Sequence, residues 1–121
     1  MPEIDSELEL ALNYLDHNKD ESLKRLFDIL EIPSISTQEK YSKDCLNAAN
    51  WFVEQLQDIG FDASIRETNG HPMVVAHFEQ EGPHFLFYGH YDVQPIDPIE
   101  LWNHDPFEPK IEKSHHGEII K

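Results

Sequence analysis

Residues 85–95 have the sequence FLFYGHYDVQP, in which an apolar run leads into a polar turn. The run Phe85–Tyr88 is apolar at every position, which predicts a strand covered on both faces in the middle of a sheet. Such a strand brings His90 and Asp92 to its carboxyl edge, where α/β sheets bind their ligands. Gly89 allows a close backbone approach or an unusual φ angle just before these two residues.

His90 and Asp92 have the residue types and the spacing of a metal-binding pair. A neutral histidine nitrogen is a good zinc ligand. A carboxylate that accepts the other ring N–H fixes the tautomer and the orientation of the ring. On spacing alone this is a weak signal. A histidine and an aspartate that hydrogen-bond to loop backbone are the alternative interpretation.

Three amphipathic segments precede this run, and their spacing predicts helices. They are residues 4–15, 23–30 and 41–56. Polar side chains near their starts are expected to be N-caps, the first within a capping box; these are Ser6, Asp20 and Thr37. Pro33 is expected to end the second helix and Gly60 the third.

The hydrophobic period changes from 3.6 to 2 after the third helix, which predicts strands. Residues 61–65 form the first strand and residues 73–78 the second, joined through the hairpin signal Asn69-Gly70. Because helices come first and strands follow, we expect an α/β fold with a mixed sheet. The run Phe85–Tyr88 needs cover on both faces, and without it we expect exposed apolar surface and aggregation.

The C-terminal third is rich in proline and predicts little regular structure. Residues 89–109 are expected to form an ordered loop anchored by Trp102 and Phe107. A last hairpin is expected to pair residues 110–112 with residues 118–120.

Composition excludes several classes of partner. The chain has 121 residues and a formal net charge of −15, so nucleic acid and anionic membrane surfaces are not expected partners. The chain has one cysteine, Cys45, which excludes an internal disulfide. We expect Cys45 to be a small buried hydrophobic residue. No signal peptide or membrane span is visible in the sequence, which predicts a cytoplasmic protein.

Several motifs occur in a fixed order along nearly the whole chain. They are LFDILEIPSIS at residues 26–36, Gly60-Phe61, GHPMVVA at residues 70–76, GHYDVQP at residues 89–95, Leu101-Trp102 and DPFEP at residues 105–109. Together they closely resemble the zinc metallopeptidase family of acetylornithine deacetylase, succinyl-diaminopimelate desuccinylase, aminoacylase, glutamate carboxypeptidase and the carnosinase-type dipeptidases. The ending Gln94-Pro95 and the loop that follows it are most similar to the dipeptidase branch.

The resemblance implies a role for two residues. In that family the histidine of the GHxD motif binds one of two zinc ions, and here that residue is His90. The aspartate two positions later orients the histidine and belongs to the active site, and here it is Asp92. The bridging aspartate, the general base and the remaining ligands follow later in the family's sequence, and no residue here matches them.

The resemblance also implies a fold and an assembly. Residues 1–121 are expected to be the N-terminal portion of an α/β/α zinc-exopeptidase catalytic domain, truncated before the bridging ligand and without the dimerisation domain. For the full-length family member the resemblance implies a homodimer. Its reaction hydrolyses the amide bonds of short peptides or N-acyl amino acids by metal-activated water.

That reaction requires more groups than this chain offers. A metal pair activates the water, and a carboxylate base moves its proton. Catalytic zinc has about three protein ligands, so we expect the 121-residue chain alone to be inactive. Two alternatives remain open at this point. One is a non-catalytic acidic interaction module that retains part of the fold, and the other is a metal-binding subunit whose missing ligands come from a partner chain.

The other histidines have structural interpretations. His71 is expected to be a turn residue, and His77 and His84 to have packing or surface roles. His104-Asp105 is close to the GHxD motif in sequence, so a contact between these residues and a metal-binding side chain is an open alternative. His115-His116 beside Glu118 is expected to be a solvated hairpin tip, with a second metal cluster as the alternative.

Overall fold

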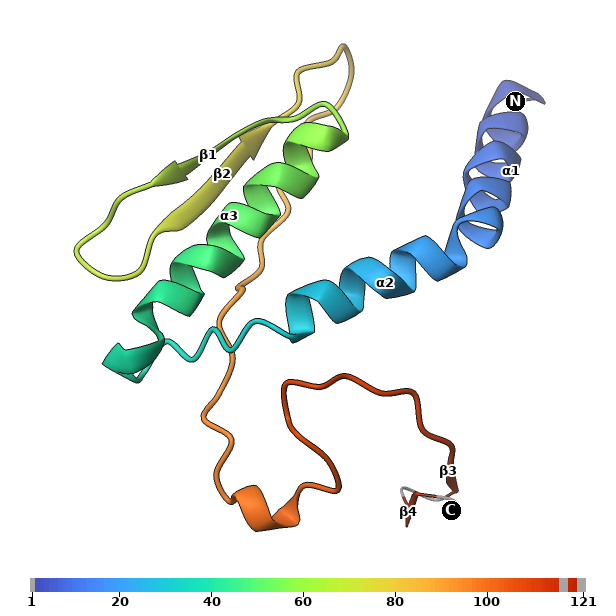
Figure 1. Ribbon diagram of the computed structural model, residues 1–121. Coiled ribbons are helices and arrows are strands. Elements are labelled where there is room, and N and C mark those ends of the chain that lie inside the picture. Colours follow the sequence, from blue (N-terminus) through green and yellow to red (C-terminus); the bar gives the residue numbers. More distant parts are fainter. Residues whose placement is uncertain (1, 116–117, 120–121) are drawn as a thin grey trace.

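The structure, a computed structural model, describes residues 2–115 and 118–119 of the chain. The helical part comes first and consists of α1 (Pro2–His17), α2 (Lys19–Leu30), the short 3-10 helix η1 (Glu39–Tyr41) and α3 (Ser42–Asp58). It is followed by β1 (Asp62–Arg66), β2 (Met73–His77), the 3-10 helix η2 (Ile99–Leu101), β3 (Ser114–His115) and β4 (Glu118–Ile119) (Figure 1). Helices therefore precede strands, as the periodicity predicts, and the chain forms a partial α/β domain.

The three helices exist where they were predicted, but their N-termini differ. α1 already includes Pro2, a residue that suits the first turn because it has no N–H to satisfy, so Ser6 lies inside the helix. α2 begins at Lys19, so Asp20 lies in its first turn, where a negative charge is favourable. α3 begins only after η1, several residues beyond Thr37. The predicted caps are therefore wrong.

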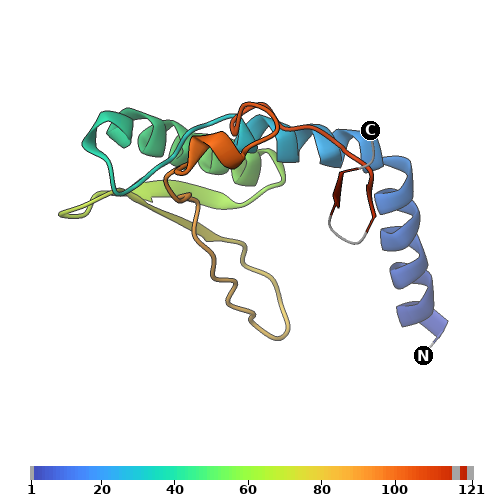
Figure 2. The ribbon, with the colours of Figure 1, turned by 90° about the horizontal axis from the view of Figure 1, so that it is seen from below.

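The core lies between α3 and one face of the β1–β2 hairpin (Figures 1 and 2). Cys45, Ala48 and Ala49 of α3 are completely buried, and Ala63 of β1 is buried opposite them. Small side chains at these positions allow the helix to lie close to the sheet. Gly60 ends α3 with a φ of +95°, a conformation that favours glycine, and directs the chain into β1. The predictions for Cys45 and Gly60 are confirmed.

The β1–β2 hairpin is antiparallel, with Ala63 opposite Ala76 and Ile65 opposite Val74. Its connection is longer than the two-residue turn that Asn-Gly predicts, because the strands end at Arg66 and begin again at Met73. Thr68 shapes this connection: its hydroxyl accepts the Gly70 N–H at 3.0 Å and donates to the His71 carbonyl at 2.7 Å.

The predicted strand Phe85–Tyr88 is absent from the structure. These four residues have no regular hydrogen bonding, and their exposed fractions lie between 79% and 95%. A strand requires a partner at its backbone edge, and within the described part of the chain no strand lies beside this segment (Figure 2). Gly89 is not in the left-handed region, and a Cβ there would meet nothing within 4 Å, so neither predicted role of this glycine is seen.

Two further parts of the molecule extend from the core. α1 leaves α2 at an angle, and its apolar side chains from Leu8 to Leu15 are exposed (Figure 2). In the proline-rich loop the Trp102 indole N–H donates to the Ile96 carbonyl at 2.9 Å, which supports its role as an anchor. Phe107 is half-buried in the same loop.

The last hairpin is present, but it is shorter than predicted. β3 pairs with β4 in antiparallel register, whereas residues 110–112 form no strand. His116 lies outside the described residues, as do the side chains of His115 and Glu118, so the prediction for this cluster stays a prediction. Among the described residues, no helix is both long enough and apolar enough to cross a bilayer.

Candidate metal centre

The GHxD motif is held by a segment that is distant in sequence. Residues 34–36, which follow α2, contact residues 91–93. Ile35 and Val93 form a parallel bridge, in which the Val93 N–H donates to the Ser34 carbonyl at 3.0 Å. The Ser34 hydroxyl donates to the Tyr91 carbonyl at 2.8 Å. Ser34 and Ile35 are 2% and 1% exposed, so the polar turn is attached to the core.

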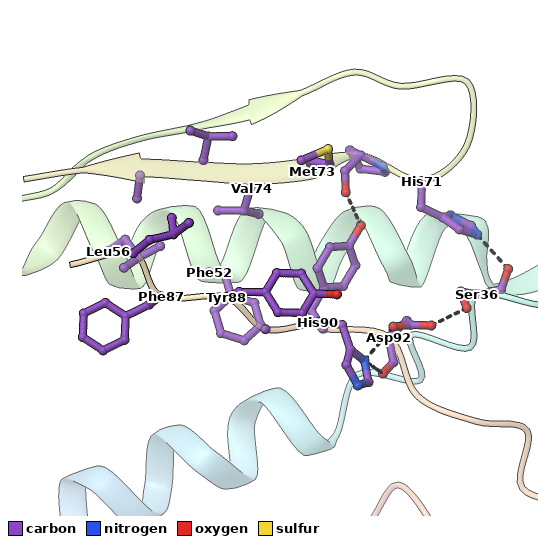
Figure 3. A pocket seen from close by; sticks show the side chains of 16 residues that line it. Ser36, Phe52, Leu56, His71, Met73, Val74, Phe87, Tyr88, His90 and Asp92 are labelled. Carbon is purple, nitrogen blue, oxygen red and sulfur yellow. Dashed lines mark hydrogen bonds and ion pairs between the residues drawn. The ribbon is translucent and has the colours of Figure 1, made fainter. Parts of the chain in front are cut away.

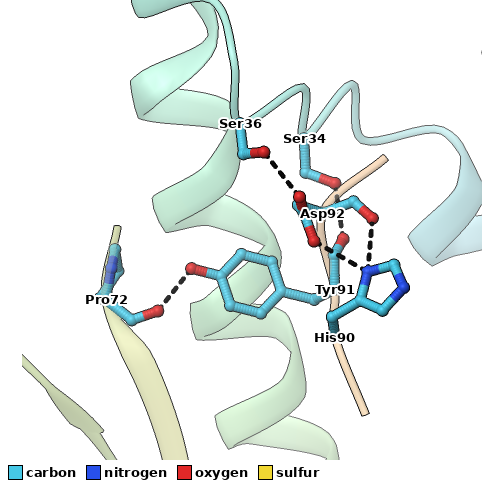
Figure 4. Close-up of polar contacts among 6 residues, drawn as sticks. All are labelled: Ser34, Ser36, Pro72, His90, Tyr91 and Asp92. Atoms are coloured by element: carbon cyan, nitrogen blue, oxygen red, sulfur yellow. Dashed lines mark hydrogen bonds and ion pairs between the residues drawn. The ribbon is translucent and has the colours of Figure 1, made fainter. Parts of the chain in front are cut away.

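Tyr91 points to the opposite side of the extended backbone from His90 and Asp92 (Figure 4). Its hydroxyl donates to the Pro72 carbonyl at 2.5 Å, and its ring centroid lies 6.5 Å from that of Phe52 on α3. Burial raises the pKa of the Tyr91 hydroxyl, which therefore stays protonated as a donor. Tyr91 thus connects the motif to both the hairpin and α3, and leaves its two neighbours facing outward.

His90 and Asp92 form a directly hydrogen-bonded pair. The Nδ1 atom of His90 lies 2.8 Å from Asp92 Oδ1 and 3.1 Å from the Asp92 carbonyl oxygen. Both neighbours are acceptors, so Nδ1 carries a proton, and in the neutral ring Nε2 has the free lone pair. The side chains are 75% and 42% exposed. A histidine with a carboxylate on one nitrogen and a free lone pair on the other is the usual arrangement of a metal ligand.

The second carboxylate oxygen of Asp92 accepts a hydrogen bond from Ser36. The Ser36 hydroxyl lies 2.6 Å from Asp92 Oδ2. This hydrogen bond, followed by that from His90, lowers the pKa of Asp92 below its ordinary value. Asp92 is therefore ionised at neutral pH and can accept the hydrogen bond from the His90 Nδ1–H.

His71 also reaches this site, from the connection between β1 and β2. Its Nε2 atom lies 2.7 Å from the Ser36 carbonyl oxygen, which accepts the ring N–H. The prediction of a turn residue is correct for its backbone but misses this contact. Ser34, Ser36 and His71 were not expected at the site. The motif PSIS was the available signal, because two serines separated by one residue face the same side of an extended segment.

An open cavity of about 1000 Å³ lies beside this cluster. Its walls are β2, the segment 86–92 and the residues Phe52 and Leu56 of α3. Figure 3 shows the polar residues Ser36, His90 and Asp92 together at one end, with Leu56 and Phe87 at the other. The cavity therefore combines a mainly apolar wall with one polar end, as ligand sites do.

The other histidines lie elsewhere. His104 does not line this cavity; its Nδ1 is buried with no hydrogen-bond partner among the described residues and lies 3.9 Å from a Glu112 oxygen. His77 and His84 contact each other, with ring centroids 6.2 Å apart. In the described part of the chain no three or more His, Cys, Asp or Glu side chains gather as a metal-binding group.

Comparison with known proteins identifies relatives of this chain. It is 27% identical to the Cys-Gly metallodipeptidase DUG1 of Candida albicans, over 88% of the chain and 25% of that protein. It is 34% identical to the succinyl-diaminopimelate desuccinylase of Bordetella avium, over 68% of the chain and 20% of that protein. The predicted resemblance to this metallopeptidase family is confirmed. No protein-family model matches the chain.

A solved structure extends the likeness to the metallopeptidase fold. The chain superposes on the dipeptidase Dug1p of Saccharomyces cerevisiae with a TM-score of 0.67 and 28% identity, over 78% of the chain and 22% of that structure. The match corresponds to the N-terminal portion of these metallopeptidases. The chain spans a quarter or less of the length of these relatives.

Proposed function

We propose that this chain contributes one part of a zinc metallopeptidase site, in which His90 binds the metal through Nε2 and Asp92 orients the ring. The 2.8 Å hydrogen bond between His90 Nδ1 and Asp92 Oδ1 carries the proposal, because it leaves Nε2 as the free ring nitrogen. The exposure of the His90 side chain, at 75%, supports it, because a ligand must be reachable. The relationship to metallodipeptidases makes metal the expected occupant.

The residues at the site fit zinc, but they are too few to bind it tightly. A neutral imidazole with a carboxylate behind it matches the preferences of the ion. No group of three or more ligand side chains exists among the described residues, whereas catalytic zinc has about three protein ligands. We therefore propose that the remaining zinc ligands, including those of a second zinc, and the general base come from polypeptide other than residues 2–115 and 118–119. The 121-residue chain alone is then inactive.

The proposed reaction is hydrolysis of the amide bond of a short peptide or an N-acyl amino acid. When bound, the metal supplies an activated water and polarises the scissile carbonyl. Within the chain, Asp92 remains ionised and keeps the proton of His90 on Nδ1. The apolar wall of the cavity accommodates apolar side chains of the substrate. The proposal includes a cytoplasmic location, and a homodimer for the full-length protein.

A chimera tests this function directly. Residues 1–121 replace the corresponding N-terminal portion of Saccharomyces cerevisiae Dug1p, and the hydrolysis of the dipeptide Cys-Gly is measured with added zinc. We expect activity in the chimera and its complete loss in His90→Ala. In Asp92→Asn the activity should fall by about 10- to 100-fold, the usual effect of replacing a residue that hydrogen-bonds to a metal ligand.

The matched control is His17→Ala, which removes a histidine at the end of α1, remote from the cavity in sequence. It should leave the activity unchanged. A folded, active chimera that is insensitive to His90→Ala contradicts the proposal. Hydrolysis by the purified 121-residue chain that disappears in His90→Ala contradicts its dependence on further ligands.

A further inference from the structure

We propose that Ser36 and His71 are positioning residues, which set the orientation and the tautomer of His90 by holding the Asp92 carboxylate. Four residues form one hydrogen-bonded series, here called the positioning relay: His71, Ser36, Asp92 and His90. Its metal-binding consequence rests on the function proposed above. The hydrogen bonds themselves do not depend on a metal.

Ser36 is the direct partner of Asp92. Its hydroxyl donates to Oδ2 at 2.6 Å, while Oδ1 accepts the His90 Nδ1–H at 2.8 Å. Because both oxygens are engaged by donors on different sides, rotation of the carboxylate would break two hydrogen bonds. Without Ser36, the partly exposed Asp92 can rotate, and water can compete with His90 for Oδ1. The Nδ1–H group of His90 would then keep only the longer, 3.1 Å contact to the Asp92 carbonyl.

His71 holds Ser36 from the other side. Its Nε2–H donates to the Ser36 carbonyl at 2.7 Å, and the ring is carried by the connection between β1 and β2. The carbonyl of His71 accepts the Thr68 hydroxyl, so its backbone is held as well. Ser36 directly follows the buried pair Ser34 and Ile35. Its hydroxyl is therefore located between the protein core and the hairpin connection.

A merely structural role is the competing explanation, and the tautomer of His90 distinguishes the two. In the relay, His90 has its proton on Nδ1, because both atoms facing Nδ1 are acceptors. A stabilising contact elsewhere in the loop would leave that proton where it is. Ring ¹⁵N chemical shifts report the tautomer without any metal, at a pH of about 8, where an ordinary histidine is neutral.

The experiment compares variants of the 121-residue chain by ¹⁵N NMR of the histidine rings. In Ser36→Ala the Nε2–H form of His90 should increase toward the population of a solvent-exposed histidine, and Ser36→Thr should restore Nδ1–H. His71→Ala should produce a smaller change in the same direction. His71→Gln should reverse it, because the glutamine amide can donate to the same carbonyl.

Ser22→Ala is the matched control, because the Ser22 hydroxyl accepts a hydrogen bond from Arg25 within α2 and is remote from His90 in sequence. It should leave the His90 tautomer unchanged, and backbone amide spectra should show that every variant is folded. An unchanged tautomer in Ser36→Ala overturns the relay. A change in Ser36→Ala that Ser36→Thr does not reverse also overturns it. An unchanged tautomer in His71→Ala overturns the part assigned to His71.

A zinc titration and the chimera separate this proposal from the function. The zinc concentration that half-saturates the change in His90 signals should rise about tenfold in Ser36→Ala. If His90→Ala leaves the activity of the folded, active chimera unchanged, the proposed function fails, while the tautomer series in the 121-residue chain still decides the relay. If zinc binds His90 equally in Ser36→Ala and Ser36→Thr, the relay has no role in metal binding and that consequence is overturned.

Discussion

The two halves of the motif FLFYGHYDVQP differ in their environment. The apolar half, Phe85–Gly89, is extended and exposed and makes no regular hydrogen bonds. The polar half, His90–Val93, is held by residues 34–36, of which Ser34 and Ile35 are buried, and by the hydroxyl of Tyr91. Hydrophobicity alone therefore does not order a segment. What orders the polar half is a set of specific partners for its backbone and side chains.

The largest expected effect tests the support of the polar half. Ile35→Ala removes most of a fully buried side chain, which typically costs 2–5 kcal/mol, so we expect about this loss in the free energy of unfolding. Urea denaturation measures it. A loss below about 0.5 kcal/mol would show that residues 34–36 do not anchor the motif.

Tyr91→Phe should have an intermediate effect. It removes the hydrogen bond to the Pro72 carbonyl and leaves the ring beside Phe52. We expect a loss of about 1 kcal/mol in the free energy of unfolding, the usual net value of one hydrogen bond. Unchanged stability would mean that water replaces the hydroxyl, and that the hairpin connection does not hold the motif.

The pH dependence of stability should show a smaller effect of the polar half. The pKa of Asp92 is lowered in the folded state by Ser36 and His90, so between the folded pKa and the ordinary value of about 3.9 the unfolded state binds more protons. This contribution is complete above about pH 5 and is lost as the pH falls from there through the folded pKa. Because Asp92 is partly exposed, we expect less than about 1 kcal/mol.

Comparing unfolding at pH 6 and pH 3 in the unsubstituted chain and in Asp92→Asn measures this contribution. The variant should lose less stability on acidification. An equal loss in both would show that Asp92 does not have a lowered pKa in the folded state.

The smallest effect on stability should come from the apolar half. Phe87 is 91% exposed, so Phe87→Ser should change the free energy of unfolding by no more than about 0.5 kcal/mol. Light scattering should show less self-association, because an exposed apolar patch becomes smaller. A large loss of stability would contradict the distinction between the halves.

The sequence predicts a contact well when its two partners are close together along the chain, and poorly when they are far apart. The apolar spacing of α3 and the glycine that ends it are local features, and so is the His90–Asp92 pair, whose members are two residues apart. Ser36 bonds to Asp92 across 56 positions, and His71 bonds to Ser36 across 35. No local pattern records such a contact. The predicted strand at Phe85–Tyr88 is wrong for the same reason, because its sequence does not specify a neighbouring strand.

Cys45 gives the chain a built-in chemical reporter. It is the chain's one thiol and is fully buried on α3, and burial raises its pKa. A thiol reagent can therefore react with it only after the packing around α3 opens. The rate of labelling of the native protein measures how often this opening occurs. It gives the lifetime of the packed scaffold that positions His90 and Asp92.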